Sequence, residues 1–438
     1  MAGAHNHDIV SIGHSINILT CAVNWHCGVK IFIIGGGGRE HAIAWRLARE
    51  GHSIYAAPGN PGIAQIGTVL SGDYLDLAKN LGPDLTVVGP EAPLAAGIAD
   101  QFRAANFAIV GPTRELAQLE ASKIYAKQLM QKLGIPTARF VQAETTEAAL
   151  AALSRFHYPV AVKADGLATG KGVIIAHDLQ AAEAAVRALG PRLVIEEFLA
   201  GEEVSFIVLA DGRRFVAFDS TQDHKTIGDG DTGPNTGGMG AYSDGRILTG
   251  QETQSIIEKI IEPVISATGF TGFLYAGLMM TADGPKVLEF NVRLGDPEAQ
   301  AILHRLDDAA DFATALMQAA TGALRATTLH SKPEPSLCVV LAAAGYPGKP
   351  RVGDPIHGIE DCPAQVFHAG TRLGARGLET AGGRVLGVTA SGADLGSAIG
   401  NAYAGIAKIH FEGMQYRRDI ARKGLKRWPP ATIEATGT

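Results

Sequence analysis

The chain has 438 residues, of which 46% are hydrophobic and 19% are charged, and its formal net charge is −6. This length allows roughly two to four domains, and the composition is that of an ordinary globular protein. The acidic balance argues against a nucleic-acid-binding surface, and no apolar run approaches the roughly 20 residues of a membrane helix. Four cysteines without paired spacing do not make a disulfide framework, so we expect a protein of the reducing cytoplasm.

Residues 1–28 differ in composition from the rest of the chain. They contain no lysine or arginine, so they lack the basic start of a signal peptide. Conceivable metal ligands in this segment are His5, His7, Cys21 and Cys27. A poorly ordered extension, or a product of an upstream start, is the favoured interpretation.

The pattern that follows is typical of the opening of a nucleotide-binding domain. A buried apolar strand over residues 29–34 runs into four glycines, Gly35–Gly38, and a helix begins after them. The dinucleotide fingerprint G-x-G-x-x-G/A fails here, because its last position falls on Glu40 or His41. A dehydrogenase is therefore disfavoured.

Three further strands continue this pattern: Ser53–Ala57, Leu85–Val88 and Ala108–Val110. The first ends in a turn at Asn60 and carries no acid placed for a ribose 2′-hydroxyl, and each of the others is followed by Gly-Pro. Strands that alternate with helices predict a parallel, Rossmann-like sheet. In such sheets ligands lie outside the carboxyl ends of the strands, where these turns are expected.

A helix is expected over residues 122–133, with Ser122 as its N-cap and Gly134 at its end. Lys123 lies in the first turn, where the helix dipole disfavours a cation. A nearby anion would explain this position. The alternative is a solvated surface lysine.

A glycine loop between two strands is the main candidate for polyphosphate binding. Apolar residues run up to Lys163, the loop includes Gly170, Lys171 and Gly172, and a β-branched strand follows. Glycine lets backbone amides wrap a polyphosphate, and the two lysines would offset its charge. The spacing is not that of a Walker A loop, which opens a helix, so we expect a flap. A tight hairpin with solvated lysines is the alternative.

An adenine slot is expected just downstream of this flap. The apolar strand that begins at Leu193 ends in two acids and two apolar residues, namely Glu196, Glu197, Phe198 and Leu199. Apolar side chains beside strand-edge backbone groups would hold the ring and read its amino edge. Glu203 would hold the ribose hydroxyls.

A candidate metal site follows on a later strand. Glu289 and Asn291 alternate along Lys286–Val292, so they point to one face. Paired oxygen ligands suit Mg²⁺ that carries substrate phosphates, although a Glu-x-Asn pair alone is usually a polar strand face. The ordered set of lysine flap, Glu-Glu-Phe-Leu hinge, Glu-x-Asn and Arg293 resembles the ATP-grasp superfamily, which joins a carboxylate to an amine through an acyl phosphate.

Further elements are expected between these motifs: a helix over Ala176–Leu189, a hairpin over Val204–Asp219, a helix over Gln254–Ala267, and a hairpin of Phe273–Thr281 with Lys286–Val292. The polar, glycine-rich segment Ser220–Tyr242 shows neither a helical nor a strand period, so we expect a long functional loop. Asp296 is expected to cap the next helix, with Pro297 as its first residue.

The predicted fold class is α/β, with an N-terminal Rossmann-like parallel sheet, a central ATP-grasp fold of two α+β subdomains and a small, separate C-terminal α+β domain. The C-terminal prediction depends on short strands between glycine turns and a final helix: Ser336–Ala342, Gln365–Gly370, Arg384–Ala390 and Asp394–Lys408. The predicted regions are an extension 1–28, an N-terminal domain 29–121, an ATP-grasp domain 122–330 with its flap subdomain at about 143–203, a C-terminal domain 331–425 and a disordered tail 426–438.

Four stretches narrow the resemblance from the ATP-grasp superfamily to one family within it. They are Gly36–Ala42, Val88–Leu94, Gln222–Tyr242 and Glu289–Glu298. Together they resemble the phosphoribosylamine–glycine ligase family of purine biosynthesis, and the likeness runs from about Val29 to about Leu425. The departures from the family pattern are Thr226 for the usual Arg, Leu294 for Phe and Asp244 for Pro. Loss of the Arg is expected to weaken one phosphate contact.

The resemblance implies that ATP drives the ligation of glycine to 5-phosphoribosylamine through glycyl phosphate, giving glycinamide ribonucleotide, ADP and phosphate. It implies catalytic roles for Arg293, Asp296 and Lys225. It implies ATP binding by Lys123, Lys163, Gly170, Lys171, Gly172, Glu196, Glu197, Phe198, Leu199 and Glu203. It implies substrate binding by Gly37, Glu40, Asn60, Glu91, His224 and Gly295, and binding of Mg²⁺ or Mn²⁺ by Glu289 and Asn291. His41 and His224 are equally compatible with structural roles.

Two other interpretations stay open. A different ATP-grasp enzyme would share the flap and hinge but would not need the Gly-Gly-Arg-Glu-His-Ala stretch. A non-catalytic nucleotide-binding regulator would have no need of Glu289, Asn291 and Arg293 together. We expect a cytoplasmic monomer that acts on small molecules, without a nucleic-acid or membrane partner.

Removal of residues 1–28 is expected to leave the protein unchanged, because the first buried strand starts at Val29. A chain that begins at Val29 after an initiator Met should match the full chain in melting temperature and turnover. A loss of several degrees in melting temperature would contradict this prediction.

Overall fold

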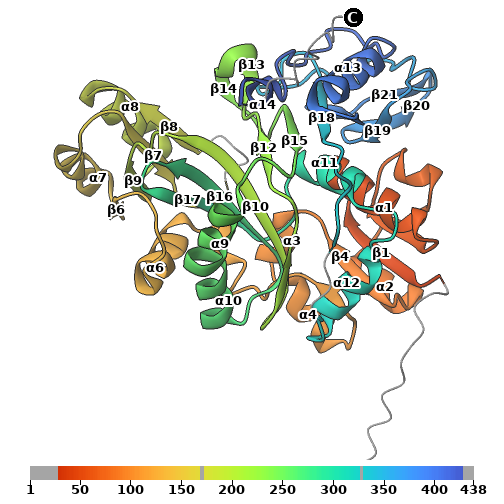
Figure 1. The fold of residues 1–438 in the computed structure, drawn as a ribbon, viewed down its shortest axis with the longest axis horizontal. Coiled ribbons are helices and arrows are strands. Elements are labelled where there is room, and N and C mark those ends of the chain that lie inside the picture. Colours follow the sequence, from red (N-terminus) through yellow and green to blue (C-terminus); the bar gives the residue numbers. More distant parts are fainter. Residues whose placement is uncertain (1–27, 168–171, 326–328, 428–438) are drawn as a thin grey trace, which may run out of the picture.

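The computed structural model describes residues 28–167, 172–325 and 329–427. Figure 1 shows the N-terminal sheet in red and orange, a flap sheet in yellow at the opposite end, and the C-terminal strands in blue. The extension 1–27 and the tail 428–438 lie outside the described residues, as do Gly170 and Lys171 of the flap.

The N-terminal sheet has five parallel strands in the order β3-β2-β1-β4-β5. They are β1 Lys30–Gly35, β2 Ser53–Pro58, β3 Thr68–Val69, β4 Leu85–Val88 and β5 Ile109–Val110, with helices α1 Gly38–Arg49, α2 Tyr74–Leu81, α3 Glu91–Ala95, α4 Ile98–Ala104 and α5 Gln118–Ala121. After Lys30, every residue of β1 is buried, as expected of a parallel strand covered on both faces. The predicted parallel sheet is confirmed.

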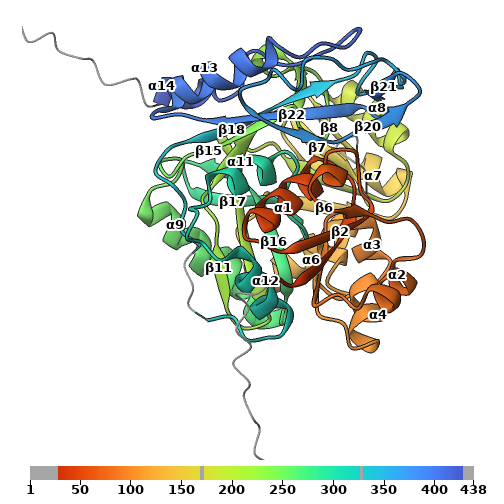
Figure 2. The same ribbon diagram turned by 90° about the vertical axis from the view of Figure 1, so that its right-hand side faces the viewer.

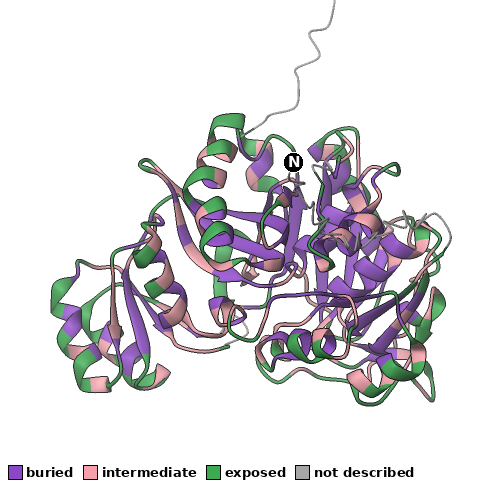
Figure 3. Cartoon of the chain, turned by 90° about the horizontal axis from the view of Figure 1, so that it is seen from below, coloured by how far each residue is buried: buried purple, intermediate pink, exposed green. Residues whose placement is uncertain are grey.

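The flap sheet is antiparallel, with the order β6-β9-β7-β8. Its elements are β6 Phe140–Ala143, α7 Thr146–Ala152, β7 Val160–Ala164, β8 Val173–Ala176, α8 Leu179–Leu189 and β9 Leu193–Glu197. It has its own small core, visible as a separate buried patch in Figure 3. Helix α8 starts three residues later than predicted, because Ala176 ends β8 and Asp178 caps the helix by accepting from the amide of Ala181.

Helix α6, Lys123–Leu133, lies between the two sheets in chain order and agrees with the helix predicted over residues 122–133. The Ser122 hydroxyl accepts from the amide of Tyr125, and Gly134 ends the helix in the left-handed region. Asp165 of the flap supplies an anion at the same end, because its Oδ1 accepts from the amide of Ile124 at 3.1 Å. A protein carboxylate therefore offsets the unfavourable position of Lys123.

The central sheet has nine strands, in the order β17-β16-β10-β12-β15-β18-β22-β19 with β11 beside β10. Its strands are β10 Glu202–Asp211, β11 Phe215–Ala217, β12 Thr221–Asp223, β15 Gly240–Ser243, β16 Thr271–Thr281, β17 Gly284–Asn291, β18 Ser336–Ala342, β19 Gln365–His368 and β22 Arg384–Ser391. The C-terminal strands β18, β19 and β22 do not form a sheet of their own, because β18 pairs with β15 and so extends the central sheet.

The segment Ser220–Tyr242 is not the long loop that we predicted. It holds β12, the start of β15 and a ribbon of β13 Thr226–Gly228 and β14 Thr232–Asn235. Gln222 lies buried between neighbouring strands, where its amide donates to the Glu203 carbonyl at 2.9 Å and its oxygen accepts from Tyr242. The segment lacks an apolar period because it buries polar side chains such as Gln222 and Thr236, which hydrogen bonds satisfy.

The remaining helices cover the central sheet. They are α9 Gly250–Ile256, a π-helical turn Ile257–Ile261, α10 Glu262–Thr268, α11 Glu298–Arg305, α12 Phe312–Ala320, α13 Leu395–Ile406 and α14 Arg422–Arg427, and a small ribbon pairs β20 Thr371–Gly374 with β21 Gly377–Thr380. Helix α11 packs against α1 of the N-terminal sheet, as Figure 2 shows. Within the described ranges, no helix has the length and apolar character needed to cross a membrane.

Arg46 on α1 holds the N-terminal sheet against the body. Its buried guanidinium donates to the carbonyls of Leu306, Asp307 and Ala310 and to the Glu50 carboxylate, at 2.6–3.2 Å. Glu50 in turn accepts from amides in the first turn of α12. This network fixes the angle between the two sheets.

Replacing Arg46 by Met is expected to destabilise the protein by about 3–5 kcal/mol, because buried carbonyls and Glu50 lose their partner. Urea unfolding measures the loss. The control is Arg49→Met, whose exposed pair with Asp308 at 3.3 Å should contribute at most about 1 kcal/mol. Equal stability of the two variants would refute the assignment.

Candidate active site

The candidate site lies where β17 ends against the carboxyl ends of the N-terminal strands. Arg293, just after β17, is 2.7 Å from Glu120 Oε1 and 3.5 Å from Glu91 Oε2. Glu91 is the first residue of α3, which follows β4. Glu91, predicted to bind substrate, therefore lies beside Arg293, predicted to be catalytic. Burial would raise the pKa of Glu91, but Arg293 holds it below its ordinary value.

Glu289 and Asn291 occupy alternate positions at the end of β17. Burial would raise the pKa of Glu289, but Lys225, Lys163 and Lys123 lower it below its ordinary value. An ionised carboxylate and an amide oxygen therefore share one strand face. In the described ranges, no group of three or more His, Cys, Asp or Glu side chains is placed to hold a metal ion. These donors fit Mg²⁺, which takes its remaining ligands from phosphates and water.

Two predicted phosphate-binding lysines converge near this face. Lys163 on β7 lies 2.9 Å from Glu196 Oε2 and donates to the Leu288 carbonyl of β17 at 3.2 Å. Lys123 donates to the Gly166 carbonyl, and burial lowers its pKa. Gly172 closes the base of the flap, because its carbonyl accepts from the Ala164 amide at 2.8 Å.

The predicted adenine hinge divides into two kinds of residue. Leu199 is buried in a small apolar cluster with Ala138 and Met279, and Phe198 is half exposed. Glu196 points elsewhere: its buried carboxylate lies between two lysines. The Glu197 carboxylate accepts from the Arg139 amide at 2.9 Å. Ala138, Leu199 and Met279 form a small apolar surface. Adenine binding by the four hinge residues stays a prediction.

Lys225 lies beside the predicted ribose ligand Glu203, with Nζ 2.6 Å from Oε2. Burial would lower the pKa of Lys225, but Glu203 and Asp223 raise it well above its ordinary value. Asp223, which we did not single out from the sequence, also has a raised pKa, but here the rise favours the uncharged form. Burial raises its pKa to about 7, and Glu298 adds to the effect.

Asp296 does not cap the following helix. Helix α11 starts after Pro297 without a side-chain cap, and the Asp296 carboxylate lies 2.8 Å from Arg384 Nη2 and accepts from Gln300 at 2.8 Å. Burial would raise the pKa of Asp296, but Arg384 holds it low. A Cβ on Gly37 would lie 3.7 Å from this carboxylate, so the first glycine turn adjoins it.

Gly295 lies directly over a second carboxylate. A side chain at this position would collide with Glu298, whose Oε1 accepts from the Tyr275 hydroxyl at 2.7 Å. We did not predict Glu298, Glu120 or Arg384 as site residues. Glu298 ends the stretch Glu289–Glu298, so a local signal for it existed. Glu120 and Arg384 stand in no such stretch.

Two predicted substrate-binding residues, Glu40 and Asn60, form hydrogen bonds with other groups of the protein. The Glu40 carboxylate accepts from the Gly37 amide at 2.5 Å and from Arg39 Nε at 2.6 Å, and it is buried. Asn60 donates to the carbonyls of Gly36 and His368 at 2.9 and 2.8 Å. Their contacts shape the turns after β1 and β2, and substrate binding by these side chains stays a prediction.

The two histidines are buried and uncharged. Burial lowers the pKa of His224 to about 3, and its Nδ1 lies 3.3 Å from the Gly240 carbonyl. Burial and His368 lower the pKa of His41 to about 3, and His41 Nδ1 accepts from the His368 amide at 2.8 Å. These contacts agree with the structural alternative for both.

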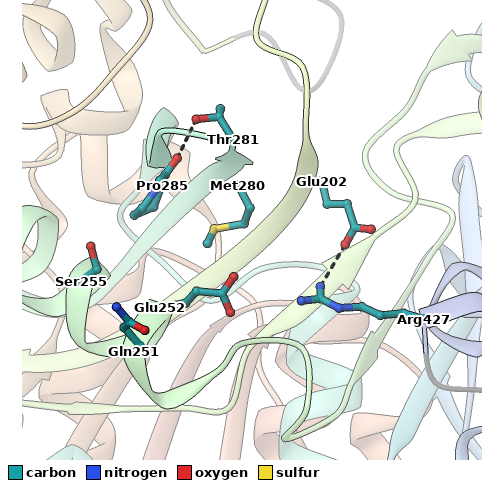
Figure 4. Close-up of a pocket in the computed structure, with 9 residues that line it drawn as sticks. Glu202, Gln251, Glu252, Ser255, Met280, Thr281, Pro285 and Arg427 are labelled. Carbon is teal, nitrogen blue, oxygen red and sulfur yellow. Dashed lines mark hydrogen bonds and ion pairs between the residues drawn. The ribbon is translucent and has the colours of Figure 1, made fainter.

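A pocket lies apart from this site, between α9 and the β16–β17 turn (Figure 4). Arg427 and Glu202 pair across it at 3.1 Å. None of the predicted site residues lines this pocket.

Asp223→Asn is expected to change stability in a pH-dependent way. The folded-state pKa of about 7 exceeds the ordinary 3.8, so the folded protein retains a proton that the unfolded chain releases. This stabilisation is complete below about pH 4 and is lost as the pH rises through about 7. The melting temperature of Asp223→Asn, relative to that of the wild type, should therefore be higher at about pH 7.5 than at about pH 5. The exposed Asp283→Asn is the control, and a pH-independent difference would contradict the assignment.

Comparisons with known proteins agree with this geometry. Three family models match in order: the N domain of phosphoribosylglycinamide synthetase over residues 29–120, its ATP-grasp (A) domain over 121–299 and its C domain over 336–423. A phosphoribosylamine–glycine ligase of Xylella fastidiosa is 45% identical, across 93% of this chain and 100% of the relative.

Solved structures give the same result. The crystal structure of phosphoribosylamine–glycine ligase from Thermotoga maritima is 36% identical, covers 90% of this chain and 100% of its own, and has a TM-score of 0.81. The biotin carboxylase domain of Hydrogenobacter thermophilus 2-oxoglutarate carboxylase shares the fold, with 15% identity, coverage of 88% and 91%, and a TM-score of 0.68. The predicted α/β fold with an ATP-grasp core is confirmed. The chain belongs to the phosphoribosylglycinamide synthetase family.

Proposed function

We propose that this protein ligates glycine to 5-phosphoribosylamine at the expense of ATP, giving glycinamide ribonucleotide, ADP and phosphate. The relatives carry the name of this reaction. The observation that carries the proposal is the contact of Arg293 with Glu91, because it brings the carboxyl end of the first sheet to the end of β17. The ligation requires the acceptor amine, bound at the first sheet, to lie beside the ATP-activated carboxylate at the end of β17.

The reaction needs no enzyme nucleophile. A glycine carboxylate oxygen attacks the γ-phosphorus, ADP leaves, and glycyl phosphate forms. The ribosylamine nitrogen then attacks the glycyl carbon, phosphate leaves, and the nitrogen loses a proton. Catalysis then consists of positioning and charge neutralisation.

The chain supplies positive charge around the transferred group. Lys123 and Lys163, together with Lys171 of the flap, act on the phosphates of ATP. Lys225 and Arg293 face the reacting carboxylate, and Asp296 and Gly295 border it. This arrangement stabilises the negative charge that develops during phosphoryl transfer.

Glu289 and Asn291 hold Mg²⁺ or Mn²⁺, which neutralises phosphate charge when it is bound. The adenine ring packs on Leu199 and Phe198, and Glu197, Gly170, Gly172 and Glu203 complete the nucleotide site, while Glu196 contributes through its contact with Lys163. Gly37, Glu40, Asn60, Glu91 and His224 form the ribosylamine site, through side chains and neighbouring amides. The protein acts in the cytoplasm as a monomer, without a nucleic-acid or membrane partner, and its domains are those predicted from the sequence.

An assay of ADP release tests this function. ADP should appear only when ATP, glycine, Mg²⁺ and 5-phosphoribosylamine are all present. ADP release with bicarbonate in place of glycine would indicate a different ATP-grasp enzyme. Nucleotide binding without turnover would indicate a regulator.

Glu289→Gln is expected to lower kcat/KM for ATP by roughly 10²-fold or more, because one electrostatic contribution to phosphoryl transfer is lost. The Mg²⁺ concentration for half-maximal rate should rise, while the melting temperature stays close to that of the wild type. Glu262→Gln, an exposed change on α10, is the matched control. An unchanged magnesium requirement in Glu289→Gln would exclude the role.

A further inference from the structure

Helix α6 carries a second lysine, Lys127, one turn after Lys123. Lys127 is 2% exposed, lies 3.0 Å from Glu196 Oε1 and donates to Thr137 Oγ1 at 2.5 Å. Its Nζ also lies 5.6 Å from the centre of the Phe140 ring. Since protein groups surround this ammonium, it does not contact a substrate.

Glu196 is shared between two lysines. One carboxylate oxygen faces Lys127 and the other lies 2.9 Å from Lys163 Nζ. The three side chains come from α6, β9 and β7, and each is buried. One carboxylate can offset only one of two ammonium charges, so this cluster keeps a single positive charge.

The positive charge is directed at the end of β17. Lys163 donates to the Leu288 carbonyl, next to Glu289. The charged groups that face the cluster are Lys123 on α6, Glu289 on β17 and Asp165 just after β7. Asp165 also pairs with Arg192 at 3.1 Å.

We infer that Lys127 is a positioning residue for the nucleotide phosphates. It occupies one oxygen of Glu196, so that Glu196 holds Lys163 at the edge of β17 without cancelling its charge. This inference rests on the proposed function, because it requires a polyphosphate against Lys163. It moves Glu196 from adenine binding to the support of a phosphate-binding lysine.

Removal of the Lys127 charge leaves Glu196 and Lys163 as a neutral pair. The attraction for an anion then falls, and the loss grows with the number of phosphates on the ligand. The fold tolerates the change, because Glu196 keeps Lys163 as a partner and Met fills a similar volume. Burial also lowers the pKa of Lys127 to about 8, so this charge is costly for the folded protein.

Nucleotide binding by Lys127→Met tests the inference. Calorimetry with ATP, ADP and adenosine should show a loss of roughly tenfold for ATP, a smaller loss for ADP and none for adenosine. Lys127→Arg should retain most of the ATP affinity. Lys132→Met, an exposed change on the same helix, is the matched control and should bind all three ligands like the wild type.

The double variant Lys127→Met with Glu196→Gln separates charge from packing. Without the carboxylate, Lys163 keeps its whole charge, so ATP affinity should recover relative to Lys127→Met. An equal loss for ATP, ADP and adenosine, or no recovery in the double variant, would overturn the inference. Failure of the wild type to bind ATP would instead overturn the proposed function.

Discussion

The arrangement of the candidate active site depends on the guanidinium of Arg293. It contacts Glu120 at 2.7 Å and Glu91 at 3.5 Å, and Glu120 also accepts from the Val292 amide at 2.8 Å. Burial would lower the pKa of Arg293, but these two carboxylates raise it above its ordinary value, so the cation persists in the interior. Loss of one carboxylate would still leave the guanidinium paired with the other, whereas loss of both would leave an uncompensated buried charge, a cost of about 3–5 kcal/mol. The carboxyl end of β4 is therefore held against the end of β17.

Two carboxylates in this site differ in charge because their neighbours differ. Lysines and Arg293 surround Glu289 and hold its pKa low, whereas Asp223 shares Lys225 with Glu203 and has a pKa of about 7. At neutral pH Glu289 is ionised and Asp223 is partly protonated. Environments that separate two pKa values in this way let neighbouring carboxylates carry different charges at one pH.

Local signals predicted elements well where a cap or turn marks the boundary. Ser122 and Gly134 delimit α6, and the Asp211-Gly212 turn joins β10 to β11. The segment Ser220–Tyr242 defeated the same reasoning, because its strands lie between others and bury hydrogen-bonded polar groups instead of an apolar face. The Asp296 cap failed because Arg384, 88 residues later, takes that carboxylate.

The site was predictable only where its residues stand in short motifs. Glu289, Asn291 and the flap lysines are such residues. The positions of Lys127 and Glu120 in the site depend instead on contacts with distant parts of the chain. The C-terminal segment illustrates this limit. No predicted catalytic residue comes from it, yet Arg384 on β22 donates to the carbonyls of both Gly237 and Asp296. Because β18 also extends the central sheet through β15, this segment and the candidate active site form one structural unit.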